Sequence, residues 1–374
     1  MLFRSRKKLH ADLILDPGDL MGQGRLCHVQ QVCRSGKPAG LMDGPKGAKV
    51  AKFKIHVVGL MQMMKNMNWI HDLRCGIQGQ AQRSPAMTRP RISFEFFPPQ
   101  SLDASFRLWE AVQVLAPLDP SFVSVTYGAG GTTRKLTQEA VGAIGKNYGL
   151  NVAAHLTCVG ATRAETMEVA EGYAAAGVSE IVALRGDPPK GAAGFEAHPD
   201  GFADSVELVQ ALADTGKFKI RVAAYAERHP EAGDPLADIR WLKRKIDAGA
   251  SSAITQFFFE VETYLRFRDL CVKEGINVPI IPGILPIQSW EGTKRFAARC
   301  GASIPARLDE SYHYAIRDGR EELLSLTQCT TLCDRLIGEG VQDLHFYTLN
   351  RPVLTREVVR VLGLGAPVAL EKVA

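Results

Sequence analysis

The sequence lacks several features that mark large classes of protein. No stretch approaches the roughly 18 uninterrupted apolar residues that a transmembrane helix needs, so we expect no membrane span. The eight cysteines are widely scattered and show no disulfide framework, which favours reduced thiols in a cytoplasmic protein. No Walker A sequence is present, and this absence disfavours a P-loop nucleotide enzyme.

Further absences argue against particular chemistries. The strand-like runs described below contain no lysine, which disfavours a Schiff-base aldolase. The histidines are dispersed, without a His-x-His pair on a strand, which disfavours a mononuclear metallohydrolase. Cys27, His28 and Cys33 suggest zinc binding, but a fourth ligand at a standard spacing is missing. No metal site is therefore expected.

Glutamate is absent from the first part of the chain, where the first one is Glu95. Residues 1–86 contain 14 Lys and Arg against five Asp, a charge of +9; since the whole chain carries +5, the remainder carries −4. The positive charge therefore belongs to an N-terminal extension. It gives no reason to expect nucleic-acid binding by the rest of the chain.

The same extension shows no sustained hydrophobic period. Three interpretations are open: a disordered basic arm, a targeting peptide, or upstream sequence translated from a start codon set too early. Met87 directly precedes the first patterned strand, which favours the third interpretation. We therefore divide the chain into an extension over 1–86 and a catalytic domain over 87–374.

Apolar, strand-like runs recur from Ile92 onward, and the first four begin at the spacing of one strand–helix unit. Eight such units predict an α/β fold, a (β/α)₈ TIM barrel with an unpatterned basic extension before it. A doubly wound sheet is the alternative, but Phe97-Pro98-Pro99 stands where a Gly-x-Gly-x-x-Gly turn would follow the first strand. The predicted strands are Ile92–Phe97, Phe122–Tyr127, Val152–Cys158, Ile181–Arg185, Ile220–Tyr225, Ala253–Phe259, Pro279–Leu285 and Leu344–Leu349.

Helical spacing fills the intervals between these runs. It covers Thr162–Ala176 and Ala237–Ala248, each followed by a glycine that can end a helix. The long interval before the last strand has room for extra helices around Lys294–Cys300 and Glu321–Ile337.

Polar side chains stand at or near the carboxyl ends of the predicted strands. In a barrel of parallel strands these ends converge on one mouth, which is where TIM-barrel enzymes carry their chemistry. Each residue taken alone has a structural explanation, but so many at the same end indicate one site. The set comprises Glu95, Thr126, Tyr127, His155, Thr157, Arg185, Asp187, Tyr225, Gln256 and Tyr347.

Glu95 is flanked by Phe94, Phe96 and Phe97. Desolvation in such surroundings should raise its pKa and favour the protonated form, as a general acid near neutral pH requires. The alternative is a buried carboxyl paired with a neighbour such as Arg185.

Two other segments could contact a large ligand. The glycine-rich turn Gly128–Thr133 could admit a flat ring or a phosphate. Arg244 and Lys245 could bind a pyrophosphate, or they could be a solvated helix face, which the residues alone favour. The residues by themselves predict a barrel enzyme with a carboxylic acid and a large polar ligand.

Several ordered motifs resemble the methylenetetrahydrofolate reductase family. The resemblance covers Arg91 to Leu362 and is that of the compact bacterial type, without a C-terminal regulatory domain. The motifs include Ser93–Pro99, Phe122–Ala129, His155–Cys158, Leu184–Asp187, His229–Ala232, Leu242–Lys245, Ile254–Phe259, Ile281–Pro286 and His345–Arg351.

This resemblance implies an FAD enzyme on a TIM barrel. NADH or NADPH would reduce the flavin and leave, and 5,10-methylenetetrahydrofolate would then be reduced to 5-methyltetrahydrofolate for methionine synthesis. It implies Glu95 as the proton donor that opens the folate ring, and Asp187 as a carboxylate near the flavin and pterin. It further implies a homo-oligomer. A related FAD barrel, such as a proline-dehydrogenase-like amine oxidase, is the alternative.

The resemblance also implies binding residues. The FAD contacts would be Thr126, Tyr127, Ala129, His155, Arg185, Gly186, Asp187, Ala203, Tyr225, His229, Ala232, Asp238, Arg244 and Lys245. The substrate contacts would be Thr126, Asp187, Gln256, Trp290, Tyr347 and Arg351. Trp241 departs from the pattern, because relatives often have a polar FAD contact at that position.

Overall fold

The structure is a computed structural model that describes residues 89–127, 133–187, 195–227, 234 and 236–366. The chain divides into two compact units, Met1–Pro85 and Ala86–Ala374, and the described residues belong to the second. The predictions for the N-terminal extension, including its cysteines, lie outside the described residues. Of the helices described, none is long and apolar enough to cross a membrane.

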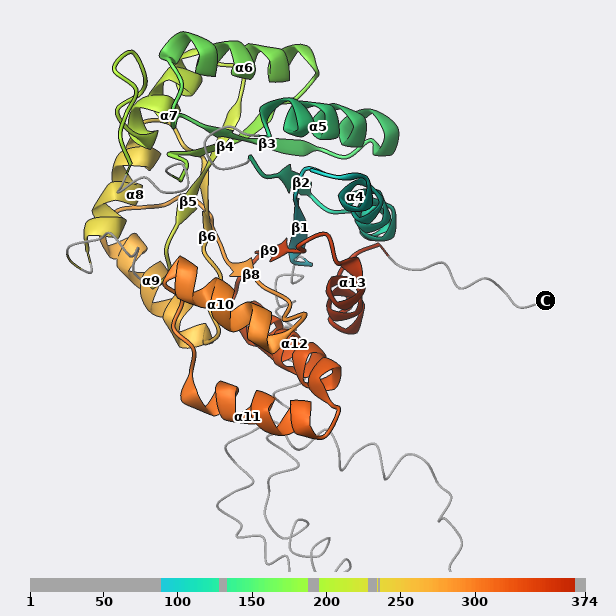
Figure 1. The fold of residues 1–374 in the computed structure, drawn as a ribbon. Coiled ribbons are helices and arrows are strands. Elements are labelled where there is room, and N and C mark those ends of the chain that lie inside the picture. The colour runs from blue at the N-terminus through green and yellow to red at the C-terminus, as the bar shows by residue number, and fades with distance from the viewer. Residues whose placement is uncertain (1–88, 128–132, 188–194, 228–233, 235, 367–374) are drawn as a thin grey trace, which may run out of the picture. The chain divides into compact units, whose positions relative to one another are not determined.

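Strands and helices alternate along the second unit, and the helices surround the strands (Figure 1). The elements are β1 (Arg91–Phe96), α4 (Leu102–Leu115), η2 (Ala116–Leu118), β2 (Phe122–Val125), α5 (Arg134–Tyr148), β3 (Val152–Thr157), α6 (Arg163–Ala175), β4 (Glu180–Leu184), α7 (Ser205–Asp214), β5 (Lys219–Ala224), α8 (Ala237–Asp247), β6 (Ser252–Thr255), α9 (Val261–Lys273), β7 (Ile280–Ile281), β8 (Gly283–Ile284), α10 (Trp290–Cys300), α11 (Ala306–Arg317), α12 (Glu321–Gly338), β9 (Asp343–Tyr347) and α13 (Pro352–Val361).

All strand pairs are parallel, in the order β7-β6-β5-β4-β3-β2-β1-β9-β8. Pro282 alone separates β7, which pairs with β6, from β8, which pairs with β9. A proline has no N–H to donate, so the two pieces are one strand interrupted at that residue. The sheet thereby closes on itself with eight strand positions, and the predicted (β/α)₈ barrel is confirmed.

All eight predicted strands are present, but several end earlier than predicted. The run Ala253–Phe259 is a strand only to Thr255, and Phe257 and Phe259 join a second apolar cluster with Trp290. An uninterrupted apolar run does not reveal where a strand leaves the sheet, because phenylalanine suits both settings.

Helix α11 was not predicted. Of its residues only Tyr312 is buried, so little of this helix belongs to the core. The main core lies between the outer helices and the sheet, as a two-layer α/β packing requires. A separate cluster fills the barrel interior with Phe122, Ala153, Val182, Ile254 and Ile281.

Candidate active site

Glu95 lies on β1 and points into the barrel, in register with Ser124 of β2 and Tyr347 of β9. Its Oε2 atom is 3.4 Å from Nε2 of His155 and 3.8 Å from Nε2 of His345. The hydroxyl of Ser124 donates to the same oxygen at 3.5 Å. The side chain is 14% exposed, so this carboxyl has nearly left solvent.

The pKa of Glu95 is shifted in the direction opposite to the prediction. Burial raises the pKa of Glu95, but hydrogen bonding and positive charge from His155 and His345 outweigh burial and lower it to about 2. The prediction of a raised pKa was therefore wrong in direction. The flanking phenylalanines do desolvate the group, but the two histidines come from distant strands that the local sequence does not show.

The ring orientation of His345 limits what it can offer Glu95. Ser93 Oγ lies 3.2 Å from the Leu344 carbonyl and 2.8 Å from His345 Nδ1. A carbonyl can only accept, so we assign the hydroxyl proton to the Leu344 carbonyl and Nδ1–H as the donor to Ser93. A neutral His345 then carries a lone pair on Nε2, and this buried atom has no hydrogen-bond partner among the described residues.

Burial lowers the pKa of His345, although Glu95 opposes this shift, so the ring is neutral near pH 7. At 3.8 Å, Nε2 of this ring and Oε2 of Glu95 are too far apart for a hydrogen bond, and His155 lies nearer to the same oxygen.

Glu95 and Asp187 open onto the same mouth. Burial first, and then Asp187, raise the pKa of Tyr225 to about 12. Burial first, then Glu95 and Tyr225, raise the pKa of Tyr347. Glu95 stands near the carboxyl end of β1 and Asp187 follows that of β4, so both acids lie at the same end of the barrel, close to these tyrosines.

Most of the predicted strand-end residues gather at this rim. The hydroxyl of Tyr347 donates to the Thr255 carbonyl at 2.6 Å, so it contributes to barrel closure. The side-chain oxygen of Gln256 accepts from the Phe257 amide at 3.0 Å. The rim residues are Glu95, Thr126, Tyr127, His155, Arg185, Gly186, Asp187, Tyr225, Gln256 and Tyr347.

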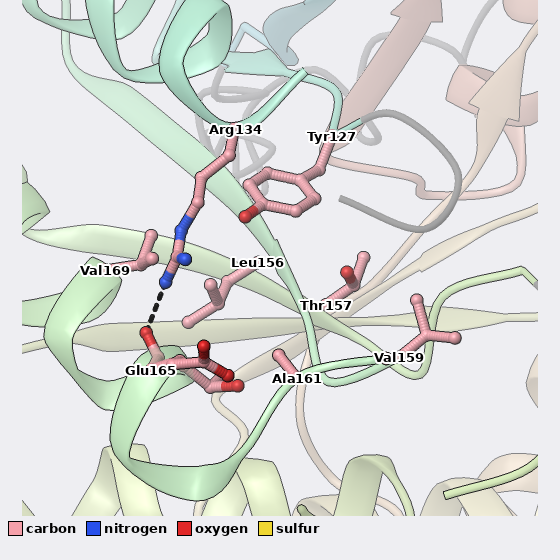
Figure 2. Close-up of a pocket in the computed structure, with 10 residues that line it drawn as sticks. Tyr127, Arg134, Leu156, Thr157, Val159, Ala161, Glu165 and Val169 are labelled. Atoms are coloured by element: carbon pink, nitrogen blue, oxygen red, sulfur yellow. Dashed lines mark hydrogen bonds between the residues drawn. The ribbon is translucent and has the colours of Figure 1, made fainter. Parts of the chain in front are cut away.

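A pocket of about 140 Å³ borders the mouth between the ends of β2 and β3 and the starts of α5 and α6. Figure 2 shows Tyr127 and Arg134 on one side and Glu165 on the other, with Thr157 in the wall between. Arg134 donates to the Glu165 carbonyl. Among the described residues the buried hydroxyl of Thr157 has no hydrogen-bond partner, which suits a polar ligand at this edge.

The cationic residues of α8 lie beside the end of β5. Lys245 is 8% exposed and donates to the Ala223 carbonyl. Burial lowers its pKa to about 8, with Asp238 opposing the shift. Arg244 is exposed, stacks on Trp241 at 4.4 Å and lies 4.0 Å from the carboxylate of Asp204. The interpretation as a solvated face holds for Arg244 but is wrong for Lys245.

The remaining predicted residues lie elsewhere. Trp290 is 1% exposed, stacks on Tyr312 at 4.3 Å and donates its indole N–H to Asp309 at 2.7 Å. This burial conflicts with the substrate stacking predicted for Trp290, because the ring packs in a helix cluster. Arg351 is exposed at the start of α13, and Ala203 is exposed before α7. Ala129, His229 and Ala232 lie outside the described residues.

Sequence reasoning missed Ser93, Ser124 and His345 as neighbours of Glu95. A signal for them was present, because alternate residues of a strand share a face. Ser93 and Glu95 stand two apart on β1, and His345 and Tyr347 stand two apart on β9. Polar residues at every second position of an otherwise apolar strand mark the interior of the barrel.

Comparisons with known proteins agree with this architecture. The family model for methylenetetrahydrofolate reductase matches residues 80–363. The chain is 43% identical over 282 residues to a 5,10-methylenetetrahydrofolate reductase of Pectobacterium carotovorum, covering 75% of this chain and 93% of that protein. It is 44% identical over 274 residues to the Salmonella typhimurium enzyme, covering 73% and 90%. It is 35% identical over 286 residues to methylenetetrahydrofolate reductase (NADH) 1 of Arabidopsis thaliana, covering 73% and 48%.

Proposed function

The chain belongs to the methylenetetrahydrofolate reductase family, and we propose that it reduces 5,10-methylenetetrahydrofolate to 5-methyltetrahydrofolate, with FAD as hydride carrier and NADH or NADPH as reductant, in a ping-pong reaction. The observation that supports this most is the meeting of Glu95 and Asp187 at one polar barrel mouth. The product would feed methionine synthesis.

The residues present suit FAD. Bound FAD would take a hydride from the nicotinamide and later pass it to the folate. The unpartnered hydroxyl of Thr157 and the Tyr127 ring offer polar and flat contacts at the mouth. Lys245 is a buried cation that donates to a carbonyl, so an anionic group such as a pyrophosphate would favour its charged form. Arg244 adds a second cation on the same helix.

In the proposed folate step Glu95 gives its proton to N10 of the bound substrate. The bond between N10 and the methylene carbon then breaks, leaving a cationic N5 iminium that becomes N5-methyl when the carbon accepts a hydride. A neutral His345 beside Glu95 adds no positive charge that would oppose protonation of this carboxyl. The carboxylate of Asp187 at the same rim stabilises the cation electrostatically.

Half-reaction kinetics test this proposal. The purified protein should show the visible absorption of oxidised FAD, and NADH should bleach it. Glu95→Gln should abolish reoxidation by methylenetetrahydrofolate and leave reduction by NADH nearly intact. Glu139→Gln, at an exposed position on α5, is the matched control and should change neither rate.

Two outcomes would contradict the proposal. A colourless protein that cannot be reconstituted with FAD would show that FAD is not its cofactor. An equal loss of both half-reactions in Glu95→Gln would show that Glu95 is not the proton donor to the folate.

A further inference from the structure

An ion-pair layer lies inside the barrel, toward the amino-terminal ends of the strands. Arg221 of β5 donates through Nε to Glu180 of β4 at 2.7 Å and through Nη1 to Ser252 of β6 at 3.0 Å. Arg221 is 5% exposed and Glu180 is 6% exposed. The other oxygen of Glu180 accepts from Asn151 at 2.9 Å and lies 3.6 Å from Nζ of Lys219. The side chain of Lys219 is 52% exposed, so the buried part of the layer is the ion pair of Arg221 and Glu180.

This layer reaches the catalytic pair through one aromatic ring. The guanidinium carbon of Arg221 lies 3.7 Å from the centroid of the Phe122 ring. The same ring stacks on His345, with centroids 5.5 Å apart and planes 10° apart. Arg221, Phe122 and His345 thus form a column inside the barrel that ends beside Glu95.

The column opposes a positive charge on His345. A protonated imidazole would be a second cation against the same aromatic ring and close to a permanent one, in a buried setting that screens little. The surroundings of His345 are Glu95 on β1, which favours its charged form, and His155 on β3 and Arg221 on β5, which oppose it. Ser93 and the edge of the Tyr347 ring are neutral contacts.

We propose that Arg221 is a positioning residue that acts through Phe122 to keep His345 neutral, so that His345 places no positive charge beside Glu95 that would hold it as a carboxylate. This inference rests on the proposed role of Glu95 as proton donor. Without Arg221, His345 takes up a proton more readily, and its charge then holds Glu95 as a carboxylate that cannot donate.

The test removes the cation without stranding its partner. Deleting Arg221 alone would leave Glu180 buried and short of a charge partner, so the double variant Arg221→Met/Glu180→Gln is used. Glu180→Gln alone is the matched control, because it keeps the cation and removes the carboxylate that offsets it. Arg221→Lys keeps the charge and should restore the wild-type behaviour.

The first readout is the charge state of His345 by nitrogen NMR on isotope-labelled histidine in the full-length protein, assigned with His345→Gln. Wild type should show a neutral Nδ1–H ring at pH 7. The double variant should titrate at a higher pH than wild type, and Glu180→Gln at a lower pH. An unchanged titration in a folded double variant, or shifts in the same direction in both, would overturn the inference.

The second readout separates a charge effect from structural damage. Reoxidation by methylenetetrahydrofolate at pH 7 should slow about tenfold or more in the double variant, while reduction by NADH stays near the wild-type rate. Equal loss of both rates would mean a structural role only. Should the double variant fail to fold, the opposite shift in Glu180→Gln decides the question by itself.

The two proposals can fail separately. If Glu95→Gln leaves folate reduction intact, the proposed acid is wrong, yet the NMR titration still reports whether Arg221 controls the charge of His345.

Discussion

At the scale of single residues, the properties of the site depend on which side chains lie next to Glu95. The apolar residues that flank Glu95 would raise its pKa, yet the pKa is lowered to about 2 beside two imidazoles. The hydroxyl of Ser93 decides whether His345 presents a proton or a lone pair to that carboxyl. The chemistry of Glu95 is thus set by residues from β1, β3 and β9 together.

Ser93→Ala tests this assignment. It removes the acceptor for Nδ1–H of His345, so the ring can change tautomer and the group that it presents to Glu95 is no longer fixed. We expect folate-dependent reoxidation to slow about tenfold and the free energy of unfolding to fall by about 1 kcal/mol. Stopped-flow kinetics and denaturant titration measure the two effects.

Ser121→Ala is the control for that variant. The Ser121 hydroxyl donates to the Ile92 carbonyl at 3.0 Å, so its loss should cost similar stability. This hydrogen bond does not involve His345, and the reoxidation rate should stay unchanged. A comparable slowing in both variants would contradict the tautomer assignment.

Lys245 makes a pH-dependent contribution to stability. Burial lowers its pKa from the usual 10.5 to about 8, so the unfolded chain holds this proton more tightly than the folded one. Stability relative to Lys245→Met should therefore rise with pH between about 8 and 10.5, by up to roughly 3 kcal/mol. Urea unfolding of both proteins across this window measures the difference, and Lys243→Met, at a more exposed neighbour, should show no such trend.

At the scale of elements, the barrel closes at a strand that is interrupted by a proline. Pro282 interrupts the strand between β7 and β8, and its carbonyl accepts from the His345 amide at 3.1 Å. Gly283 lets two neighbours approach, because a Cβ there would lie 2.1 Å from the Thr255 carbonyl and 2.5 Å from the Tyr347 ring. Glycine is required here by close approach of other backbone.

Gly283→Ala should therefore be severely destabilising. We expect a loss of about 3 kcal/mol or more, since the clash involves backbone that cannot move aside. Gly142→Ala is the control within α5, where nothing lies within 4 Å and helix propensity should stabilise by about 0.5–1 kcal/mol. Melting temperatures that fall equally in both variants would contradict this account.

At the scale of the whole molecule, the described strands form a closed sheet. β1 pairs with β2 on one side and β9 on the other, so the first described strand has no open edge to be covered by preceding residues. The family model also matches mainly this part of the chain, residues 80–363.

A chain that starts at Met87 should keep its melting temperature and its rate of folate reduction. Activity measured beside the full-length protein at equal FAD content tests this, and mass spectrometry of the native N-terminus shows which form exists. Loss of folding in the shortened chain would mean that the extension contributes to the barrel.

Prediction from sequence succeeded where the controlling information is local. The eight strand positions follow from short apolar runs, and the interval from Thr162 to Ala176 follows from helical spacing, close to the observed α6. It failed for α11, which buries only Tyr312, and for Trp290, whose ring is taken up by a helix cluster. How little of α11 is buried, and which ring stacks on Trp290, cannot be read from neighbouring residues.

The sequence by itself determined the barrel, its family and the end of the barrel that carries polar residues, because periodicity and strand-end chemistry are properties of consecutive residues. Only the tertiary structure decided the direction in which the pKa of Glu95 shifts. The residues that lower it, His155 and His345, and the proposed influence of Arg221, come from strands far apart in the chain. Electrostatic interactions depend on distance in space and on burial, and closing the barrel sets both.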